Sequence, residues 1–591
     1  IFLPFVSDVS NTVVGEVSAP AVQAALANGS VFLGALERLD AEPGAVITWG
    51  ANTTLQMFTT SAVPGGGIDL GGLELNATGV GQVLINGNTT LQNFPCDVVT
   101  PRITSAGGLI DARAPTGLLT VQQVISSSGG PVTLVGSSVR LSQNVTGGSV
   151  DVIALNPALG TLTIDPGVVV RGPLRITYQA AEMFLAGSTS DSRPGQLTLS
   201  DRAANREIRL GSASSDAALG LLSADLATLM AGRLVIGRNA FNNFLPTGSI
   251  TVTVPLDGNG PTGLFTHLTL LTDATINLNS AGGVTTPGDQ IYGAPISLGA
   301  SQTLNSAGAA NDIMFGAING AFALSVMAGT ATFNGPVGGA VPLSSLTVSA
   351  TRIFASDLRT TGAIALTTTG GDLNLNGAEN AAATVRAGTS IVLTSSGDLV
   401  VGANGGPVTR VSAGTTLTRN VLGVERVGNN DFLGVDAGGI DLTQPSFVID
   451  TLTVPDGQNI TLTATDGDII LGHLVARGGF VTLRATRRVL NSNNPGPIPP
   501  DTANVTAAFL SVTAGGLAGE QNPAIQLNTA IDRLTHASAT GSGSISIQNE
   551  GMLTVDSVSA ASGAIRLSSS QGGMRVTREV AALAGLVSLN A

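Results

Sequence analysis

The sequence has 591 residues, of which 43% are apolar, 11% are charged and 77 are glycine, so it can bury a core and is not generally disordered. Its formal net charge of −13 disfavours nucleic acid as a partner, because phosphate binding needs a basic surface. All 26 basic residues are arginine, which excludes chemistry that depends on lysine, and no stretch is apolar enough for a membrane-spanning helix.

Cys96 is the only cysteine of the chain, which excludes a disulfide framework and a cysteine-based metal site. A single cysteine is typically a small buried apolar residue, and intermolecular pairing is the alternative.

An N-terminal segment, residues 1–46, differs from the rest of the chain. Residues 18–26 (SAPAVQAAL) and 31–39 (VFLGALERL) have apolar residues at helical spacing, separated by Asn28-Gly29-Ser30. Pro20 suits the first turn of a helix, and Ser30 can cap the second segment. We therefore expect one or two short helices that form a cap and cover open strand edges.

From about Ile47 the apolar residues alternate with polar ones, and Gly, Asn, Ser or Pro separates the short runs, as is typical of strands. The clearest runs are Leu73–Leu75, Val83–Ile85, Val132–Leu134, Val139–Leu141, Val150–Val152, Leu162–Ile164, Leu197–Leu199, Ile208–Leu210 and Ile276–Leu278. Residues 223–252 combine two such runs with a helical corner at Ala224–Met230.

The second half of the chain repeats one unit: an apolar triplet, a polar turn and a second triplet. It occurs at residues 362–377, 389–403, 458–473, 543–557 and 563–577. Self-similarity at this period indicates a solenoid, because one unit cannot bury its apolar face alone.

The fold class that we predict is all-β: a right-handed parallel β-helix (β-solenoid) with a short helical N-terminal cap. The β-helix is continuous over residues 47–591, with loop excursions near 254–263 and 492–501. About two dozen coils at about 4.8 Å each would give a rod of about 100–120 Å. Residues 585–591 still follow the strand pattern, so we expect further chain or another subunit to cover that edge.

Two stretches carry a resemblance to a known family. Residues 221–238 (LLSADLATLMAGRLVIGR) followed by GSITV, and residues 318–353, resemble the repeats of filamentous-haemagglutinin-type bacterial surface proteins and exoproteins. The resemblance covers roughly residues 120–591 and implies an adhesin-like β-helix on or outside the cell. The family's secretion domain carries Asn-Pro-Asn motifs, whereas this chain has only Asn156-Pro157-Ala158-Leu159.

Some β-helices cleave polysaccharides, which requires paired carboxylates at a defined separation. Asp466 and Asp468, with His473 nearby, are the best candidates in this chain. The Gly-His-Gly and Arg-x-Lys motifs of pectinase-like β-helices are absent, and Trp49, Tyr178 and Tyr292 are the only Trp and Tyr residues available for sugar stacking. The simpler interpretation is that both aspartates shape a turn, so we predict no catalytic residues.

Metal and cofactor sites have little support in the sequence. His267, His473 and His536 lie far apart, without the spacing of paired metal ligands. Gly65-Gly66-Gly67-Ile68-Asp69 only loosely matches a Ca²⁺-binding repeat, and Ca²⁺ at Asp466 and Asp468 or at Asp257 stays an alternative. Asn-x-Ser/Thr sequons begin at seven asparagines, as chance would give in so Asn- and Thr-rich a chain: Asn28, Asn52, Asn76, Asn88, Asn144, Asn459 and Asn504.

We therefore expect a non-enzymatic structural or interaction protein of the bacterial cell surface or extracellular matrix: a fibre, sheath or adhesin subunit. It would self-associate end to end or side by side, and a cell-surface glycan or protein receptor is a possible partner. The alternative is a polysaccharide-binding or polysaccharide-cleaving β-helix, which would carry a carboxylate-lined cleft.

Overall fold

A computed structural model gives the fold of the chain as two compact units, unit 1 (Ile1–Ala300) and unit 2 (Ser301–Ala591). It describes residues 16–35, 37–59, 66–87, 95–238, 246–258, 260, 264–306, 308, 310–376, 384–401, 410–413, 416–421, 425–427, 432–435, 440–444, 446–454, 456–492, 503–516 and 523–591.

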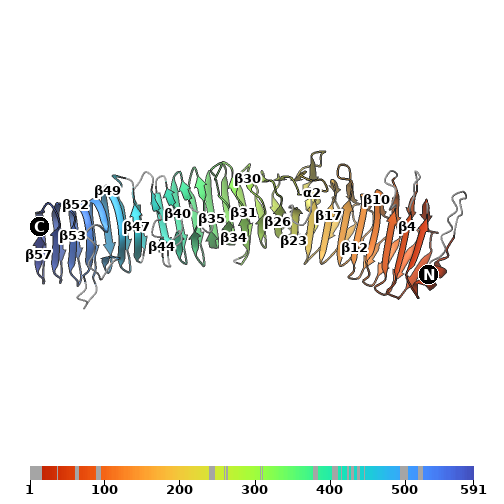
Figure 1. Cartoon of the computed structure of the whole chain (residues 1–591), viewed down its shortest axis with the longest axis horizontal. Helices are drawn as coiled ribbons and strands as arrows, with labels where there is room; N and C mark the ends of the chain where they lie inside the picture. Colours follow the sequence, from red (N-terminus) through yellow and green to blue (C-terminus); the bar gives the residue numbers. More distant parts are fainter. Residues whose placement is uncertain are drawn as a thin grey trace. The chain divides into compact units, whose positions relative to one another are not determined.

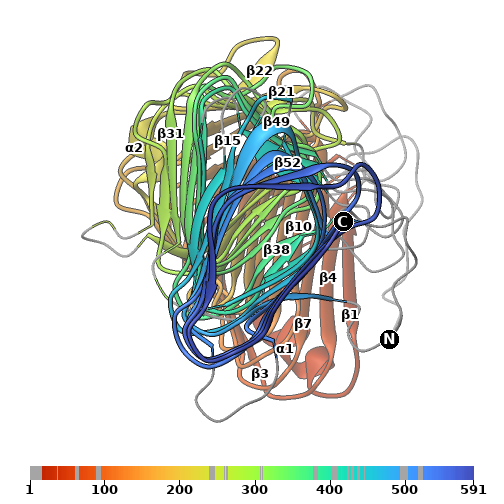
Figure 2. The same ribbon diagram turned by 90° about the vertical axis from the view of Figure 1, so that its left-hand side faces the viewer.

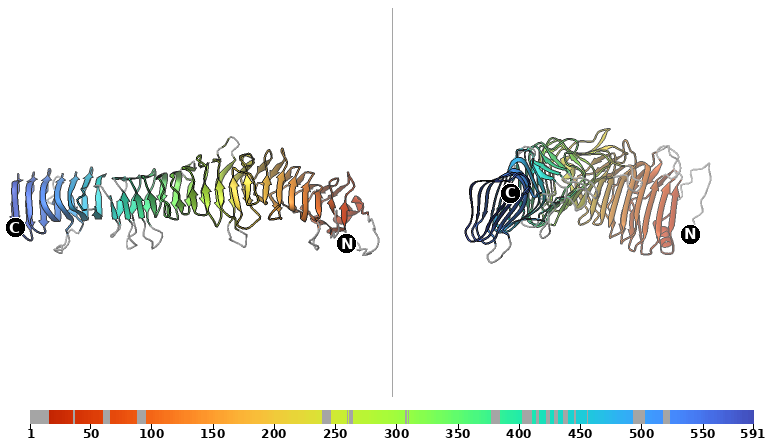
Figure 3. Two further views of the ribbon diagram at one scale, coloured as in Figure 1. Left: turned by 90° about the horizontal axis from the view of Figure 1, so that it is seen from above. Right: turned by 60° about the vertical axis from the view of Figure 1, so that its left-hand side comes forward.

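Both units consist of short strands that pair in parallel with the equivalent strand one coil further along the chain (Figure 1). The flattened loop of each coil is clearest in the blue C-terminal coils of unit 2, seen end-on in Figure 2. Figure 3 shows the strands of successive coils lying side by side within each unit. The predicted fold class, a parallel β-helix with a short N-terminal helix, is confirmed.

Unit 1 has three rows of stacked strands. The first row contains β1 (Val31–Ala35), β4 (Thr54–Thr59), β7 (Gln82–Gly87), the starts of β10 (Ile110–Val121) and β12 (Pro131–Leu141), β14 (Ser149–Ala154), β17 (Arg175–Gln179), β20 (Gln196–Ser200), β23 (Leu229–Gly237), β26 (Phe265–Leu271) and β29 (Gln290–Tyr292). The second contains β2 (Arg38–Asp40), β5 (Gly67–Asp69), β8 (Asp97–Thr100), the ends of β10 and β12, β15 (Thr161–Ile164) and β18 (Glu182–Phe184), and then the sheet of β22 (Ala218–Leu221), β21 (Glu207–Leu210), β24 (Ile250–Val252), β27 (Ile276–Leu278) and β30 (Ile296–Leu298). The third contains β3 (Val46–Trp49), β6 (Glu74–Ala77), β9 (Arg102–Ser105), β11 (Ile125–Ser127), β13 (Val145–Thr146), β16 (Val169–Arg171), β19 (Thr189–Asp191) and the start of β23, and then β25 (Leu256–Asp257) and β28 (Val284–Thr286).

Unit 2 is built in the same way. Its first coils contain β31 (Gln302–Ser306), β32 (Asp312–Phe315), β33 (Ile318–Asn319), β34 (Ala323–Phe333), β35 (Ser345–Phe354), β36 (Leu358–Thr360), β37 (Ile364–Thr368), β38 (Leu373–Leu375), β39 (Thr384–Ala387), β40 (Ser390–Ser395), β41 (Leu399–Val401), β42 (Arg410–Ala413), β43 (Thr416–Val421), β44 (Glu425–Val427) and β45 (Phe432–Val435). Its last coils contain β46 (Ile440–Gln444), β47 (Phe447–Thr453), β48 (Ile460–Ala464), β49 (Ile469–Ala485), β50 (Val489–Asn491), β51 (Val505–Ala514), β52 (Ile525–Ala539), β53 (Ile545–Asn549), β54 (Leu553–Ala560), β55 (Ile565–Ser569), β56 (Met574–Ala582) and β57 (Val587–Asn590).

The core of each unit is a set of inward-facing columns, one residue per coil. In unit 1, one such column contains Val83, Ile110, Val132, Val150 and Ile176, which pair in succession and are all fully buried. Each buried side chain of this size contributes about 1.5–3 kcal/mol through the hydrophobic effect. The first and third residues of the apolar triplets therefore form the core, and the middle residues face outward.

The N-terminal cap differs from the sequence-based expectation in one element. The first expected helix is present as α1 (Ala19–Leu26), but the second expected helical segment, residues 31–39, contains the strands β1 and β2. Tertiary context overrides the helical spacing there, because Val31–Ala35 pairs residue by residue with β4. The ring of Phe58 lies against Gly34, where a Cβ atom would meet it at 2.6 Å.

The helical corner expected at Ala224–Met230 is present but shorter, and residues 239–245 of the stretch 223–252 lie outside the described residues. Ser223–Leu226 is the short helix α2, and β23 and β24 follow it. Of the predicted loop excursions, residues 259, 261–263 and 493–501 lie outside the described residues. Leu256–Asp257 within the first excursion is the strand β25, paired with β28.

Glycines allow neighbouring coils of unit 1 to approach closely at one corner. Ser105 and Ser127 are paired one coil apart, and their hydroxyl oxygens accept the backbone N–H groups of Gly108 (2.8 Å) and Gly130 (3.1 Å). A Cβ atom on Gly130 would overlap backbone carbonyl oxygens of the preceding coil.

We predict that Gly130→Ala destabilises unit 1 by about 1–3 kcal/mol, because the coil spacing at this corner is fixed by backbone hydrogen bonds. Urea denaturation followed by circular dichroism measures the change. Gly29→Ala is the control, because a Cβ atom at Gly29 meets nothing within 4 Å. Equal stability of the two variants would contradict this account of the corner.

Candidate functional site

The turn that contains Asp466 and Asp468 was the leading catalytic candidate from the sequence. Asp466 is exposed, whereas both carboxylate oxygens of Asp468 are bound by the next coil. Its Oδ1 accepts the backbone N–H of Arg488 at 3.0 Å, and its Oδ2 lies 2.8 Å from Nη2 of the same arginine. This geometry fastens one coil to the next and gives Asp468 a structural role.

His473 lies on β49, a few residues after this turn. Its Nδ1 atom is 3.1 Å from the carbonyl oxygen of Ala503, which is an acceptor for a proton on that nitrogen. No contact joins His473 to Asp466 or Asp468 among the described residues.

The contact made by Asp468 is one instance of a recurrent link between coils, which sequence reasoning missed. In each case a side-chain oxygen of one coil accepts a backbone N–H of the next: Asp97 from Leu118 (2.8 Å), Asn144 from Val169 (2.8 Å), Asp357 from Thr384 (2.6 Å), Asp372 from Asp398 (2.8 Å) and Asn459 from Phe480 (2.8 Å). The available signal is an Asp or Asn that recurs near a strand end at about the coil period.

Ion pairs link the coils on the outer faces in the same manner. Arg175 reaches Asp151 at 2.6 Å, and Arg140 reaches Asp165 at 3.1 Å. In unit 2, Arg533 lies 2.8 Å from Asp556, and the hydrogen bonds from Arg533 and Thr577 hold the pKa of Asp556 below its usual range. Exposed pairs of this kind each contribute little stability.

His267 in unit 1 and His473 in unit 2 each contact a backbone group. The Nδ1 atom of His267 lies 2.9 Å from the backbone nitrogen of Asp289. The Asp289 carboxylate is 3.2 Å from the same Nδ1 atom and 3.8 Å from Arg233, which is its cationic partner. Within the described ranges, no three His, Cys, Asp or Glu side chains come together as a metal site would require.

A buried ion pair lies where the chain of unit 1 makes its longest excursion, between β20 and β23. The side chains of Asp201 and Arg206 are 1% and 7% exposed, and Oδ2 lies 3.0 Å from Nη1. Arg206 also donates to the carbonyl oxygens of Ala181 (2.7 Å) and Ala218 (3.2 Å). One guanidinium group thereby joins the preceding coil, the 201–206 turn and the strand β22.

The same excursion is fixed by a second buried carboxylate, that of Asp225 on α2. It accepts the backbone N–H groups of Leu185 and Leu222, both at 2.9 Å. A buried carboxylate needs such partners, and these two bonds link α2 to the chain at Leu185.

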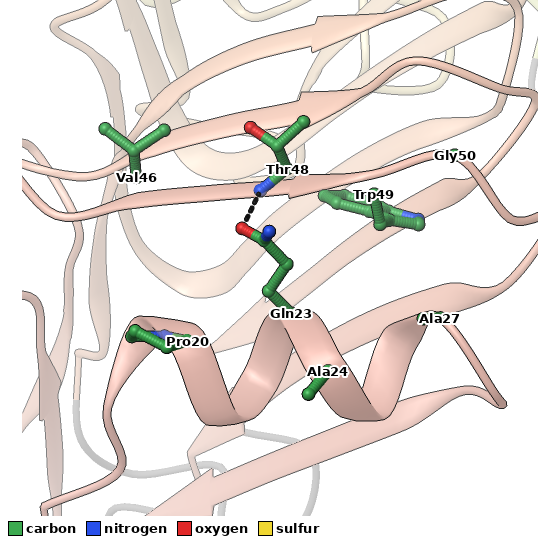
Figure 4. A pocket seen from close by; sticks show the side chains of 8 residues that line it. All are labelled: Pro20, Gln23, Ala24, Ala27, Val46, Thr48, Trp49 and Gly50. Atoms are coloured by element: carbon green, nitrogen blue, oxygen red, sulfur yellow. Dashed lines mark hydrogen bonds between the residues drawn. The ribbon is translucent and has the colours of Figure 1, made fainter.

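A groove of about 410 Å³ lies between α1 and the strand β3. Its walls are uncharged: Pro20, Gln23, Ala24, Ala27, Val46, Thr48, Trp49 and Gly50 line it (Figure 4). The side chain of Gln23 crosses the groove, and its Oε1 accepts the backbone N–H of Thr48 at 3.0 Å. The groove is therefore the space left between a short helix and the edge of the first coil.

The remaining sequence candidates have the following positions. Cys96 is buried, with 1% exposure. Asn504 is 3% exposed and its Nδ2 donates to the carbonyl oxygens of Leu471 and Gly472, so the nitrogen to which a glycan would attach is inaccessible. Asn88 lies outside the described residues. Among the residues that the structure describes, no helix has the length and apolar character needed to span a membrane.

Comparison with models of protein families, with curated proteins and with solved structures finds no match to this chain.

We predict a pH-dependent contribution of Asp201 to stability. Burial raises the pKa of Asp201 to about 6. The hydrogen bond from the backbone N–H of Ala203 and the guanidinium group of Arg206 both oppose this shift. Because an unfolded Asp titrates near 3.9, the folded state binds this proton more tightly. The protonated Asp201 therefore adds on the order of 1–3 kcal/mol to the free energy of unfolding. This contribution is complete below about pH 4 and is lost as pH rises through about 6.

Urea denaturation of wild type and Asp201→Asn across this pH range measures the effect. The variant should lose the fall in stability between about pH 4 and pH 6. The exposed Asp466→Asn is the control for the charge change. An identical pH profile for wild type and Asp201→Asn would contradict the prediction.

We also predict that Cys96 is unreactive in the native protein. Burial raises the pKa of its thiol to about 11, with a smaller effect of the neighbouring Asp97, so almost no thiolate forms at neutral pH. Iodoacetamide should label Cys96 only after unfolding, which mass spectrometry detects. Rapid native labelling, or a disulfide-linked dimer of native protein, would instead support intermolecular pairing.

Proposed function

We propose that this protein is a structural subunit of the bacterial cell surface or extracellular matrix: a fibre, sheath or adhesin stalk that acts by shape and self-association. The observation that carries the proposal is how the outer faces use their charged and amide side chains. Asp97, Asn144, Asp151, Asp468 and Asp556 each bind a neighbouring coil. Side chains used in this way stabilise a regular surface and are not free to act on a substrate.

The low charge content and the acidic balance support an extended surface that stays soluble and avoids nucleic acid. The resemblance of residues 221–238 and 318–353 to filamentous-haemagglutinin-type repeats points to the same location, on or outside the cell. The partners in this proposal are further copies of the chain, side by side or end to end, with a surface glycan or protein as a receptor.

The aromatic pair of Phe480 and Phe509 does not favour the polysaccharide alternative. Phe480 and Phe509 are paired on adjacent strands, and their rings stack with centroids 4.2 Å apart and planes inclined by 14°. Each ring therefore covers one face of the other. A sugar ring stacks on an aromatic face, so this pair is better explained as a stabilising contact between coils.

Electron microscopy of native material and light scattering over a concentration series test the proposal. We expect filaments, sheets or lateral bundles, and a mass that rises with concentration. A strictly monomeric protein at high concentration would overturn it. Hydrolysis of a polysaccharide that is lost in Asp466→Asn or Asp468→Asn, with folding retained, would favour the enzymatic alternative.

A further inference from the structure

Three buried polar atoms without a hydrogen-bond partner belong to the excursion of unit 1 between β20 and β23, near α2 in Figure 1. They are the hydroxyl oxygen of Ser200 and the Nε atoms of Arg206 and Arg238. Such atoms are few in native proteins, and a water or ion near them is one established explanation. The excursion is therefore the part of unit 1 whose polar groups are least satisfied by the protein itself.

The strand register brings the charged residues of this region together. Leu199 of β20 pairs with Ile236 of β23, so Asp201 and Arg238, two residues further along, lie one coil apart. The guanidinium group of Arg238 also reaches back to the 201–206 turn, where its Nη2 donates to the carbonyl oxygen of Arg202 at 3.3 Å. Two arginines from separate segments are thus neighbours at the end of β23.

The positive charges of this group outnumber the negative ones. Asp201 is the partner of Arg206, at 3.0 Å, and Glu207 is held by an arginine outside the group. Neither Arg202 nor Arg238 forms an ion pair with any residue that the structure describes. Three arginines and one aspartate leave an excess of two positive charges at neutral pH.

The chain on either side does not offer a missing carboxylate. Residues 239–245, which follow Arg238 in the sequence, contain no Asp or Glu. Burial and the nearby charge of Arg202 lower the pKa of Arg238, and Asp201 opposes this shift. Arginine keeps its proton at neutral pH, so an anion is the remaining means of balancing the pair. Guanidinium groups match the oxygens of carboxylate, sulfate and phosphate groups in geometry as well as charge.

The backbone that carries these arginines is already fixed. Asn205 has a φ of 57°, in the left-handed region, and its N–H donates to the carbonyl oxygen of Pro246 at 2.8 Å. Gly248 lies so close to Asn205 that a Cβ atom on it would overlap the Asn205 carbonyl oxygen. Arg238 and Thr247 exchange two hydrogen bonds at 3.0 Å, one from each backbone N–H. A ligand that binds a preorganised site of this kind loses little free energy in ordering the protein.

From these observations we propose that Arg202 and Arg238 form a binding site for an oxyanion, a carboxylate, sulfate or phosphate group, supported from below by the buried pair of Asp201 and Arg206. The group is either a free inorganic ion or part of an acidic polysaccharide, two sources that the experiment separates. The inference goes beyond the proposed function, because the site requires no self-association.

The test uses the full chain and two probes that carry the same group: sodium sulfate and dextran sulfate. Each is titrated by calorimetry in chloride buffer of constant ionic strength. The site variants are Arg202→Gln and Arg202→Gln/Arg238→Gln. Arg140→Gln is the matched control, because it removes the same charge from an exposed arginine of unit 1 that is paired with Asp165.

We expect saturable binding of sulfate groups by wild type and by Arg140→Gln, and an affinity at least about tenfold lower in Arg202→Gln. The double variant should show no saturable binding. In sulfate-free buffer, Arg202→Gln should be at least as stable to urea as wild type, because it removes a repulsion. If Arg238→Gln impairs folding by circular dichroism, Arg202→Gln alone decides the question.

Three results would overturn the site: no binding of either probe by wild type, an unchanged affinity in Arg202→Gln, or an equal loss in Arg140→Gln. Binding of dextran sulfate alone assigns a polysaccharide, and equal affinity per sulfate group for both probes assigns a free ion. Filaments of a wild type that binds neither probe would refute the site and leave the proposed function standing. Arg202-dependent binding by a strictly monomeric protein would do the reverse.

Discussion

Each strand of a parallel β-helix carries backbone N–H and C=O groups on both edges that need hydrogen-bond partners, and the neighbouring coils supply most of them. This requirement fixes the rest of the structure of both units. It sets the spacing that the corner glycines Gly108 and Gly130 allow, and it holds the inward columns of Val, Ile and Leu in register. It also explains why polar side chains on the outer faces reach along the stack towards the next coil.

The sequence predicts the strands well, because the inward column needs an apolar residue at every second position. Ile208-Arg209-Leu210 is an example. Its first and third residues are fully buried, and the side chain of its middle residue pairs with Glu207 on the surface. The local pattern fails at Val31–Ala35, where spacing favours a helix but pairing with β4 makes a strand. Where a segment can form a helix or a strand, its neighbours in the fold determine which one forms, and a single sequence does not show those neighbours.

The candidate site was predictable only in its residue types. That Asp466 and Asp468 occupy a turn follows from the sequence, but that Arg488 binds Asp468 does not, because the two residues meet only through the coil register. The buried pair of Asp201 and Arg206 is harder still, since charged residues are rarely buried and nothing local marks them. Their role becomes visible only when Ala181 and Ala218, from separate segments, surround the guanidinium group.

Because a coil is fastened mainly to the coils on either side, each unit also has a mechanical character. A pulling force applied at one end of the stack would load the hydrogen bonds of the outermost coil first, while the inner coils kept theirs. Extension would therefore proceed as a series of separate peeling events. In the first coils of unit 1, one event would release the length of chain between Val31 and its partner Leu55. A molecule of this kind dissipates a sudden load in small increments and leaves the coils that have not yet peeled intact.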